Sequence, residues 1–138
     1  MSLAPELLEA YRAAVYVVYG SPPIEFRIGE PSDVLDALLR IQKASSAAFV
    51  SSADVEGVVT PENQRRMKEF LLRGNLAGTP YKVYQGEGRD PARKWDAEPS
   101  LLVMGIPRAE AEALGRKLAQ NAIVWIEPGR APELVVLA

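Results

Sequence analysis

The order of short apolar runs and amphipathic segments constrains the fold of this 138-residue chain more than any other feature. Runs that are rich in β-branched and aromatic residues, or that alternate between apolar and polar residues, predict strands. They lie at residues 15–19, 24–29, 47–51, 81–85, 101–104, 122–126 and 134–137. Helices are predicted at about residues 5–14, 33–42, 61–73 and 107–118. This order predicts an α/β (α+β) fold, a single domain over residues 1–138 with a mixed sheet of about six or seven strands covered by about three to four helices.

The predicted helix boundaries rest on local signals. Ser32 is a favourable N-cap for the second helix, and Thr60-Pro61-Glu62 combines an N-cap, a first-turn proline and an acid at the start of the third. Gly74 is predicted to end that helix. Residues 86–99 are predicted to form one long loop, and loops of this length in compact domains are often functional.

Cysteine and histidine are both absent from the sequence. Without cysteine there are no disulfides, thiolate nucleophiles, iron–sulfur clusters or thiolate zinc sites. Without histidine there are no imidazole bases and no histidine-ligated metals. Acid–base chemistry would have to use carboxylates, lysine or tyrosine, and a metal site would need oxygen ligands of the Mg²⁺ or Ca²⁺ type. The sequence predicts no cofactor and no resident metal.

Neither a membrane span nor a secretory signal is expected from the sequence. No apolar run approaches the ~18 residues that a transmembrane helix needs, and the first residues lack a basic region followed by a hydrophobic one. These features predict a soluble, cytoplasmic protein with no membrane partner.

Charge is unevenly distributed, although the formal net charge is only −2. Residues 1–59 carry 8 acids and 4 bases, residues 60–95 carry 4 acids and 8 bases, and residues 96–138 carry 6 acids and 4 bases. The middle segment is therefore where an anion would bind. Solvated basic faces of a helix and a loop explain the same pattern. The acidic balance of the whole chain argues against nucleic acid as a partner.

Two polar residues lie on or beside the apolar face of the third predicted helix. At about 100° per residue, Asn63 shares a face with Met67 and Phe70, and Arg66 lies at its edge. Asn63 is also in the first turn, where free backbone N–H groups favour anions. One interpretation is a ligand site in which Arg66 holds an anion. The other is that Asn63 bonds a loop carbonyl around residues 54–59 and Arg66 pairs with a carboxylate.

Four further polar residues border buried strands. Glu98 and Ser100 lead into the fifth predicted strand, and Gln120 and Asn121 lead into the sixth. Glu98 is interpreted either as an ion-pair partner of Arg66 or as a general base or Mg²⁺ ligand. The two amides are interpreted either as a helix C-cap, with Asn121 in the left-handed conformation, or as groups that orient a polar ligand.

Aromatic residues are weaker candidates for a site. Tyr11, Tyr16 and Tyr19 are interpreted as edges of the core whose hydroxyl groups reach water. Trp95 is interpreted as the anchor of the long loop, with stacking on a ligand ring as the alternative.

Four motifs carry a family resemblance that spans nearly the whole chain. They are Tyr11 with Tyr16, Asn63 with Arg66, Trp95 with Glu98-Pro99-Ser100, and Gln120-Asn121-Ala122-Ile123-Val124-Trp125. In this order they resemble the uncharacterised bacterial domain-of-unknown-function family numbered 3293. The resemblance implies a compact α/β domain with a shared polar cluster, and it implies no activity. Three positions depart from the family pattern: Asp54-Val55 stands where Asn-Pro is usual, and Ala119 where Gly is common.

The leading functional prediction is a small polar pocket that binds a small anionic or polar ligand. Its predicted residues are Asn63, Arg66, Glu98, Ser100, Gln120 and Asn121. Arg66 would hold the anion, and the amides would orient the ligand. One alternative is a protein-interaction or homo-oligomerisation module that uses a strand edge or the basic segment. The other is a carboxylate- or Mg²⁺-dependent enzyme with Glu98 as its weak catalytic candidate.

Overall fold

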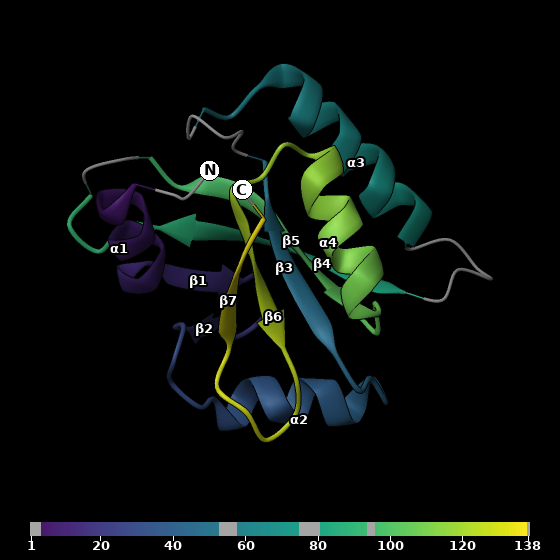
Figure 1. The fold of residues 1–138 in the computed structure, drawn as a ribbon. Helices are drawn as coiled ribbons and strands as arrows, with labels where there is room; N and C mark the ends of the chain where they lie inside the picture. Colours follow the sequence, from purple (N-terminus) through teal and green to yellow (C-terminus); the bar gives the residue numbers. More distant parts are fainter. Residues whose placement is uncertain (1–3, 53–57, 75–80, 94–95, 138) are drawn as a thin grey trace.

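The computed structural model describes residues 4–52, 58–74, 81–93 and 96–137, except for the side chains of residues 71–74. These residues form helices α1 (Pro5–Ala13), α2 (Asp33–Ile41), α3 (Pro61–Gly74) and α4 (Arg108–Lys117). The strands are β1 (Val15–Val18), β2 (Ile24–Phe26), β3 (Ala47–Ser51), β4 (Lys82–Arg89), β5 (Glu98–Met104), β6 (Ala122–Ile126) and β7 (Glu133–Val136). The elements follow the predicted order, and the predicted single α+β domain is confirmed (Figure 1).

The strands form one curled sheet in the order β2-β1-β4-β5-β3-β6-β7. Every neighbouring pair is antiparallel, so the predicted mixed sheet is wrong in this respect. Strands that are joined through a helix, such as β3 with β4 or β5 with β6, do run in the same direction. In each of these two cases one antiparallel strand lies between them, so the helical crossover produces no parallel pair.

Apolar side chains line both faces of the sheet, because successive residues of a strand point to opposite sides. Helix α2 packs on one face through Leu35 and Leu39. Helices α3 and α4 pack on the other face, where Met67 and Ala111 join the second core. Figure 1 shows α3 and α4 next to each other on the right of the view. Helix α2 lies below them, and α1 lies on the left.

The predicted starts of α2 and α3 are confirmed. The Ser32 hydroxyl accepts a hydrogen bond from the Leu35 N–H at 3.2 Å, and α2 begins at the next residue, Asp33. Helix α3 begins at Pro61, and the Thr60 hydroxyl accepts from the Asn63 N–H at 3.1 Å.

Among the described residues, no helix combines the length and the apolar character needed to span a bilayer.

The predicted loop at residues 86–99 is shorter than expected at both ends. Strand β4 continues to Arg89, and β5 already begins at Glu98. Gly86 was predicted to begin this loop, yet it lies in β4 opposite Val18 of β1. The change matters for function, because Glu98 is held in a strand ladder opposite Gly88 and not in a loop. Asp54, Val55 and Trp95 lie outside the described residues.

Candidate functional site

A cavity of about 40 Å³ lies between α1 and the sheet, at the margin of the core that α2 covers. Tyr16, Phe49 and Val124 belong both to this core and to the cavity wall. The polar residues of the wall come from five separate segments and are Tyr11, Tyr16, Ser51, Glu98, Ser100, Gln120 and Asn121. Four of the six predicted site residues, Glu98, Ser100, Gln120 and Asn121, are thus brought together.

The register of the antiparallel strands places Glu98 beside Ser51. Ser51 of β3 lies opposite Ser100 of β5, and Glu98 is two residues before Ser100 on the same face. The Ser51 hydroxyl donates to Oε2 of Glu98 at 3.0 Å, and the Ser100 hydroxyl donates to the Glu98 carbonyl oxygen at 2.8 Å. The carboxylate is therefore fixed at the cavity wall by both its side chain and its backbone.

Burial raises the pKa of the Glu98 carboxyl above its ordinary value, and the hydrogen bond from Ser51 opposes part of this rise. A carboxylate with a raised pKa in a cavity is a frequent property of functional sites. The structure does not place Glu98 in the predicted ion pair with Arg66, whose carboxylate partner is Glu62 at 2.7 Å.

Two tyrosines connect α1 to the same cavity. The Tyr16 hydroxyl donates to the Tyr11 carbonyl oxygen at 2.6 Å, and Nδ2 of Asn121 donates to the Tyr11 hydroxyl at 3.3 Å. The pKa of both phenols is raised, first by burial and further by the charge of Glu98. The two tyrosines and Glu98 thus line one cavity, and the hydrogen bonds of Tyr11 and Tyr16 join α1 to its wall.

The turn after α4 positions the two amides. Ala119, with φ +54°, takes the left-handed conformation that was predicted for Asn121. The Gln120 N–H then donates to the Gly115 carbonyl oxygen at 2.8 Å, which closes the helix end. As a result Oε1 of Gln120 accepts from the Ser51 N–H at 2.9 Å and ties the turn to the end of β3.

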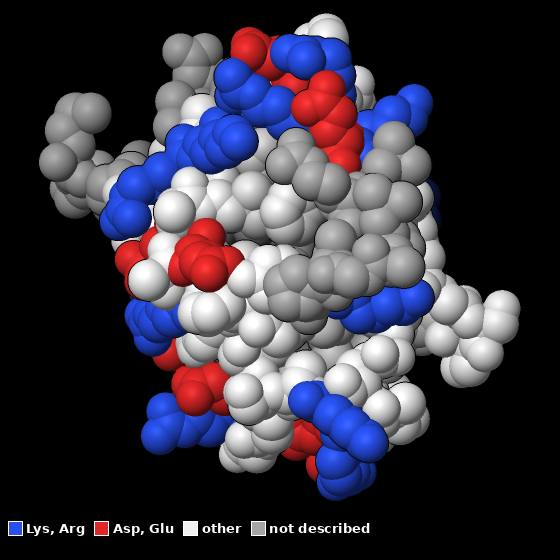
Figure 2. Space-filling view, turned by 90° about the vertical axis from the view of Figure 1, so that its right-hand side faces the viewer, with Lys and Arg blue, Asp and Glu red and all other residues white. Residues whose placement is uncertain are grey.

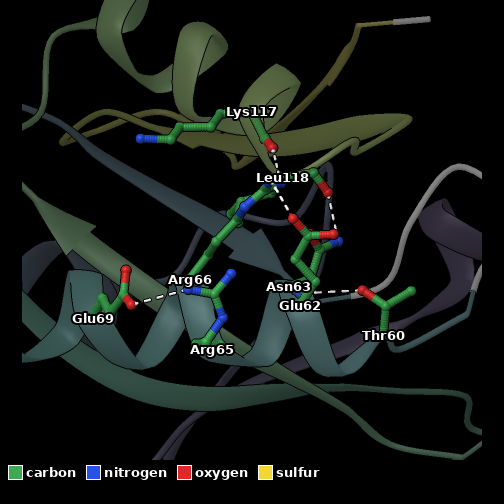
Figure 3. Close-up of polar contacts among 8 residues, drawn as sticks. All are labelled: Thr60, Glu62, Asn63, Arg65, Arg66, Glu69, Lys117 and Leu118. Atoms are coloured by element: carbon green, nitrogen blue, oxygen red, sulfur yellow. Dashed lines mark hydrogen bonds and ion pairs between the residues drawn. The ribbon is translucent and has the colours of Figure 1, made fainter.

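Asn63 and Arg66 belong to a different place, the contact between α3 and the end of α4. Nδ2 of Asn63 donates to the carbonyl oxygens of Leu118 at 2.7 Å and Ser52 at 3.3 Å. Nη1 of Arg66 donates to the Lys117 carbonyl oxygen at 3.0 Å (Figure 3). The bonds to Lys117 and Leu118 satisfy carbonyl groups that α4 leaves open at its carboxyl end, and the bond to Ser52 joins α3 to the residue after β3.

The prediction of one pocket from six residues is therefore wrong for Asn63 and Arg66. The structural interpretation is supported instead: the amide bonds backbone carbonyls, although at Ser52 and Leu118 and not at residues 54–59, and Arg66 pairs with Glu62. The sheet separates Asn63 and Arg66 from the cavity, because α3 packs on the opposite face of the sheet. Arg66 is thus not placed to hold an anion beside Glu98.

On the face seen in Figure 2, Lys and Arg are interspersed with Asp and Glu. Arg65 pairs with Glu69 at 3.4 Å and Arg66 with Glu62 at 2.7 Å, each one turn apart on α3. This agrees with the interpretation of the basic segment as solvated helix and loop surface.

Comparison with known proteins finds a similarity to one family over about half of the chain. Residues 56–123 match the family model described as Protein of unknown function (DUF3293). The predicted resemblance to this family is confirmed over these residues, whereas the motif of Tyr11 and Tyr16 lies outside the match. The DUF3293 match includes Glu98, Ser100 and both amides, whereas Tyr11 and Ser51 precede it. Comparisons with curated proteins and with solved structures found no match.

Sequence reasoning did not assign Tyr11, Tyr16 and Ser51 to the site. The tyrosines were interpreted as edges of the core. This interpretation is correct for Tyr16, which is buried and packs on Phe49. It did not include the hydrogen bonds that the Tyr11 and Tyr16 hydroxyls make within the protein. Ser51 ends an apolar strand two residues after Phe49, so its side chain shares the Phe49 face. That alternation was the available signal for Ser51.

The two alternative functions stay predictions. For the Mg²⁺ version of the enzyme, the described part of the chain contains no group of three or more acidic side chains arranged to hold a metal. For the interaction module, β2 and β7 are the outer strands of the sheet and have three and four residues. Edges this short offer little backbone for pairing with another chain.

Proposed function

We propose that this DUF3293 domain is a binding module that holds one end of a small polar ligand in the cavity beneath α1. The observation that carries the proposal is the convergence on the cavity of Glu98, the Tyr11 and Tyr16 hydroxyls and the two amides of the α4–β6 turn. Ligand-binding cavities combine apolar side chains with a small number of polar groups that orient the ligand, and this cavity has both.

The free-energy cost of burying the Glu98 carboxylate supports a role in binding. Placing a carboxylate where burial raises its pKa costs folding free energy, which a purely structural wall would avoid with an apolar residue. A ligand that offers hydrogen bonds to the carboxylate offsets this cost only when it is bound.

The size of the cavity limits what enters it. A volume of about 40 Å³ has room for roughly three water-sized groups, since each needs about 10–15 Å³. The cavity is therefore suited to the terminal group of a ligand, and the remainder would lie outside. This favours recognition of one functional group over conversion of a large substrate.

The test compares two serines with the same local role. Ser100 and Ser46 are both buried, and each hydroxyl donates to a backbone carbonyl, that of Glu98 at 2.8 Å and that of Ile106 at 2.7 Å. Of these two serines, Ser100 lines the cavity and Ser46 does not. In Ser100→Val the added methyl groups would occupy cavity space, whereas Ser46→Val imposes the same chemical change elsewhere.

The measurement is an NMR titration of the labelled protein with methylammonium chloride, sodium formate and acetamide at equal ionic strength. We expect at least one probe to shift the amide resonances of Ser51, Ser100 and Asn121 saturably in the wild type and in Ser46→Val. Ser100→Val should lose this response. Absence of a saturable response to every probe in the wild type, or an undiminished response in Ser100→Val, would contradict the proposal.

A further inference from the structure

We propose that the group bound in the cavity is an ammonium group, the protonated end of a primary amine, held against Glu98. This inference rests on the proposed binding function and names the ligand class of the same cavity. It replaces the anion of the sequence-based prediction, because Arg66, the residue predicted to hold an anion, lies on the other face of the sheet.

Among the described residues, three of the four hydroxyl groups of the cavity wall donate their hydrogen within the protein, whereas the Tyr11 hydroxyl accepts from Asn121. Tyr16 donates to the Tyr11 carbonyl, Ser51 to the Glu98 carboxylate, and Ser100 to the Glu98 carbonyl. A hydroxyl has one hydrogen to donate and two lone pairs that accept. Toward a ligand these three groups can therefore act only as acceptors, and an ionised carboxylate is also an acceptor. The matching ligand group is rich in donors, and an ammonium group has three donors and no acceptor.

The charge of the wall favours the same choice. Glu98 is the one charged side chain among the described residues that line the cavity, and those residues include no Lys or Arg. The aromatic rings of Tyr11, Tyr16 and Phe49 also line it. The faces of such rings attract cations, and this attraction is strongest where water is excluded. A carboxylate beside aromatic rings suits a cation and repels an anion.

Size restricts the ligand to an unbranched amine. The volume of about 40 Å³ has room for an ammonium group with one or two carbon atoms, by the same estimate of about 10–15 Å³ for each water-sized group. A guanidinium group is planar and larger, and a quaternary ammonium has no N–H to donate. The ligand class is therefore a primary alkylamine whose chain continues out of the cavity.

Binding should depend on pH with a defined sign. The ionisable groups facing one another across the cavity are Glu98, Tyr11 and Tyr16, and the pKa of each is raised. Both phenols therefore stay neutral below their ordinary pKa of about 10, and an alkylammonium stays protonated there. Glu98 is the group whose charge changes at acidic pH. Affinity for an amine should rise as pH increases through the pKa of Glu98 and then level off.

The experiment uses methylammonium chloride, sodium formate and methanol as cationic, anionic and neutral probes of similar size. The amide resonances of Ser51, Ser100 and Asn121 are followed at pH 7.5 and constant ionic strength. We expect saturable shifts with methylammonium alone. Glu98→Gln should weaken this binding at least about tenfold, because it removes a charge-assisted hydrogen bond. The control Glu25→Gln, at an exposed position on β2, should bind as the wild type does.

Each outcome separates this inference from the proposed function. Saturable binding of formate or methanol in place of methylammonium would leave the binding function standing and overturn the ammonium assignment. No binding of any probe would overturn both. If Glu98→Gln fails to fold, the pH dependence in the wild type decides: methylammonium affinity that stays constant while Glu98 is protonated contradicts the inference.

Discussion

At the scale of single residues, Ala119 is the clearest point of strain beside the cavity. Its φ of +54° lies in the left-handed region, where a Cβ costs roughly 1 kcal/mol and glycine costs nothing. This explains why glycine suits the position in the family pattern. Ala119→Gly should therefore raise the free energy of unfolding by about 0.5–1 kcal/mol, measured by urea denaturation.

The control is the same substitution inside α4. Ala113 is exposed, so Ala113→Gly removes no packing and should lower the free energy of unfolding by about 1 kcal/mol. Opposite signs for the two variants would attribute the difference to backbone conformation. A destabilisation of similar size at both positions would show that Ala119 carries no strain.

Residue chemistry was predictable from the sequence, whereas the partner of each residue was not. Burial of the Asn63 amide was predicted from helix periodicity, and so was its need for hydrogen-bond partners. Its actual partners, the carbonyls of Ser52 and Leu118, lie 11 and 55 residues away in the chain. The same holds for Glu98, whose contact with Ser51 spans 47 residues. Such contacts depend on strand order, which a single sequence does not encode locally.

At the scale of secondary structure elements, the two glycines of β4 have different roles. A Cβ added to Gly86 would clash with the Val17 carbonyl oxygen of β1. A Cβ added to Gly88 would lie 4.0 Å from the Tyr16 ring, an ordinary contact. Gly86→Ala should therefore separate β1 from β4 and lower the free energy of unfolding by at least about 2 kcal/mol.

Gly88→Ala, two residues along the same strand, is the matched control and should remain within about 1 kcal/mol of the wild type. Thermal denaturation followed by circular dichroism measures both variants. Equal stability of Gly86→Ala and Gly88→Ala would show that close approach of β1 does not require a glycine.

These glycines also explain why element boundaries were harder to predict than element types. Helix starts were predicted correctly at Asp33 and Pro61, because N-caps and first-turn prolines act through neighbouring residues. The end of β4 was placed too early, because glycine usually weakens a strand. At Gly86 the missing Cβ serves the approach of a strand about 70 residues away, a tertiary effect that overrides the local preference.

At the scale of the whole molecule, one sheet is shared by two hydrophobic cores. Phe49 of β3 faces the α2 side, and its neighbour Val50 faces the side of α3 and α4. Strands β5 and β6 alternate in the same way. Loss of packing on one face therefore weakens strands that the other face also needs, and the two cores are expected to unfold together.

A truncation in the first core, read out in the second, tests this coupling. Leu39 is fully buried under α2, so Leu39→Ala should cost about 2–5 kcal/mol. Trp125 lies in the second core, and Trp95→Phe makes it the remaining tryptophan of the two in the chain. In that background, Leu39→Ala should lower the Trp125 fluorescence midpoint and the circular dichroism midpoint equally. Ile41→Ala, on the same helix but 74% exposed, should shift neither by a comparable amount. If the fluorescence midpoint stays in place while the circular dichroism midpoint falls, the cores unfold independently, and the cavity beside the first core could open without loss of the second.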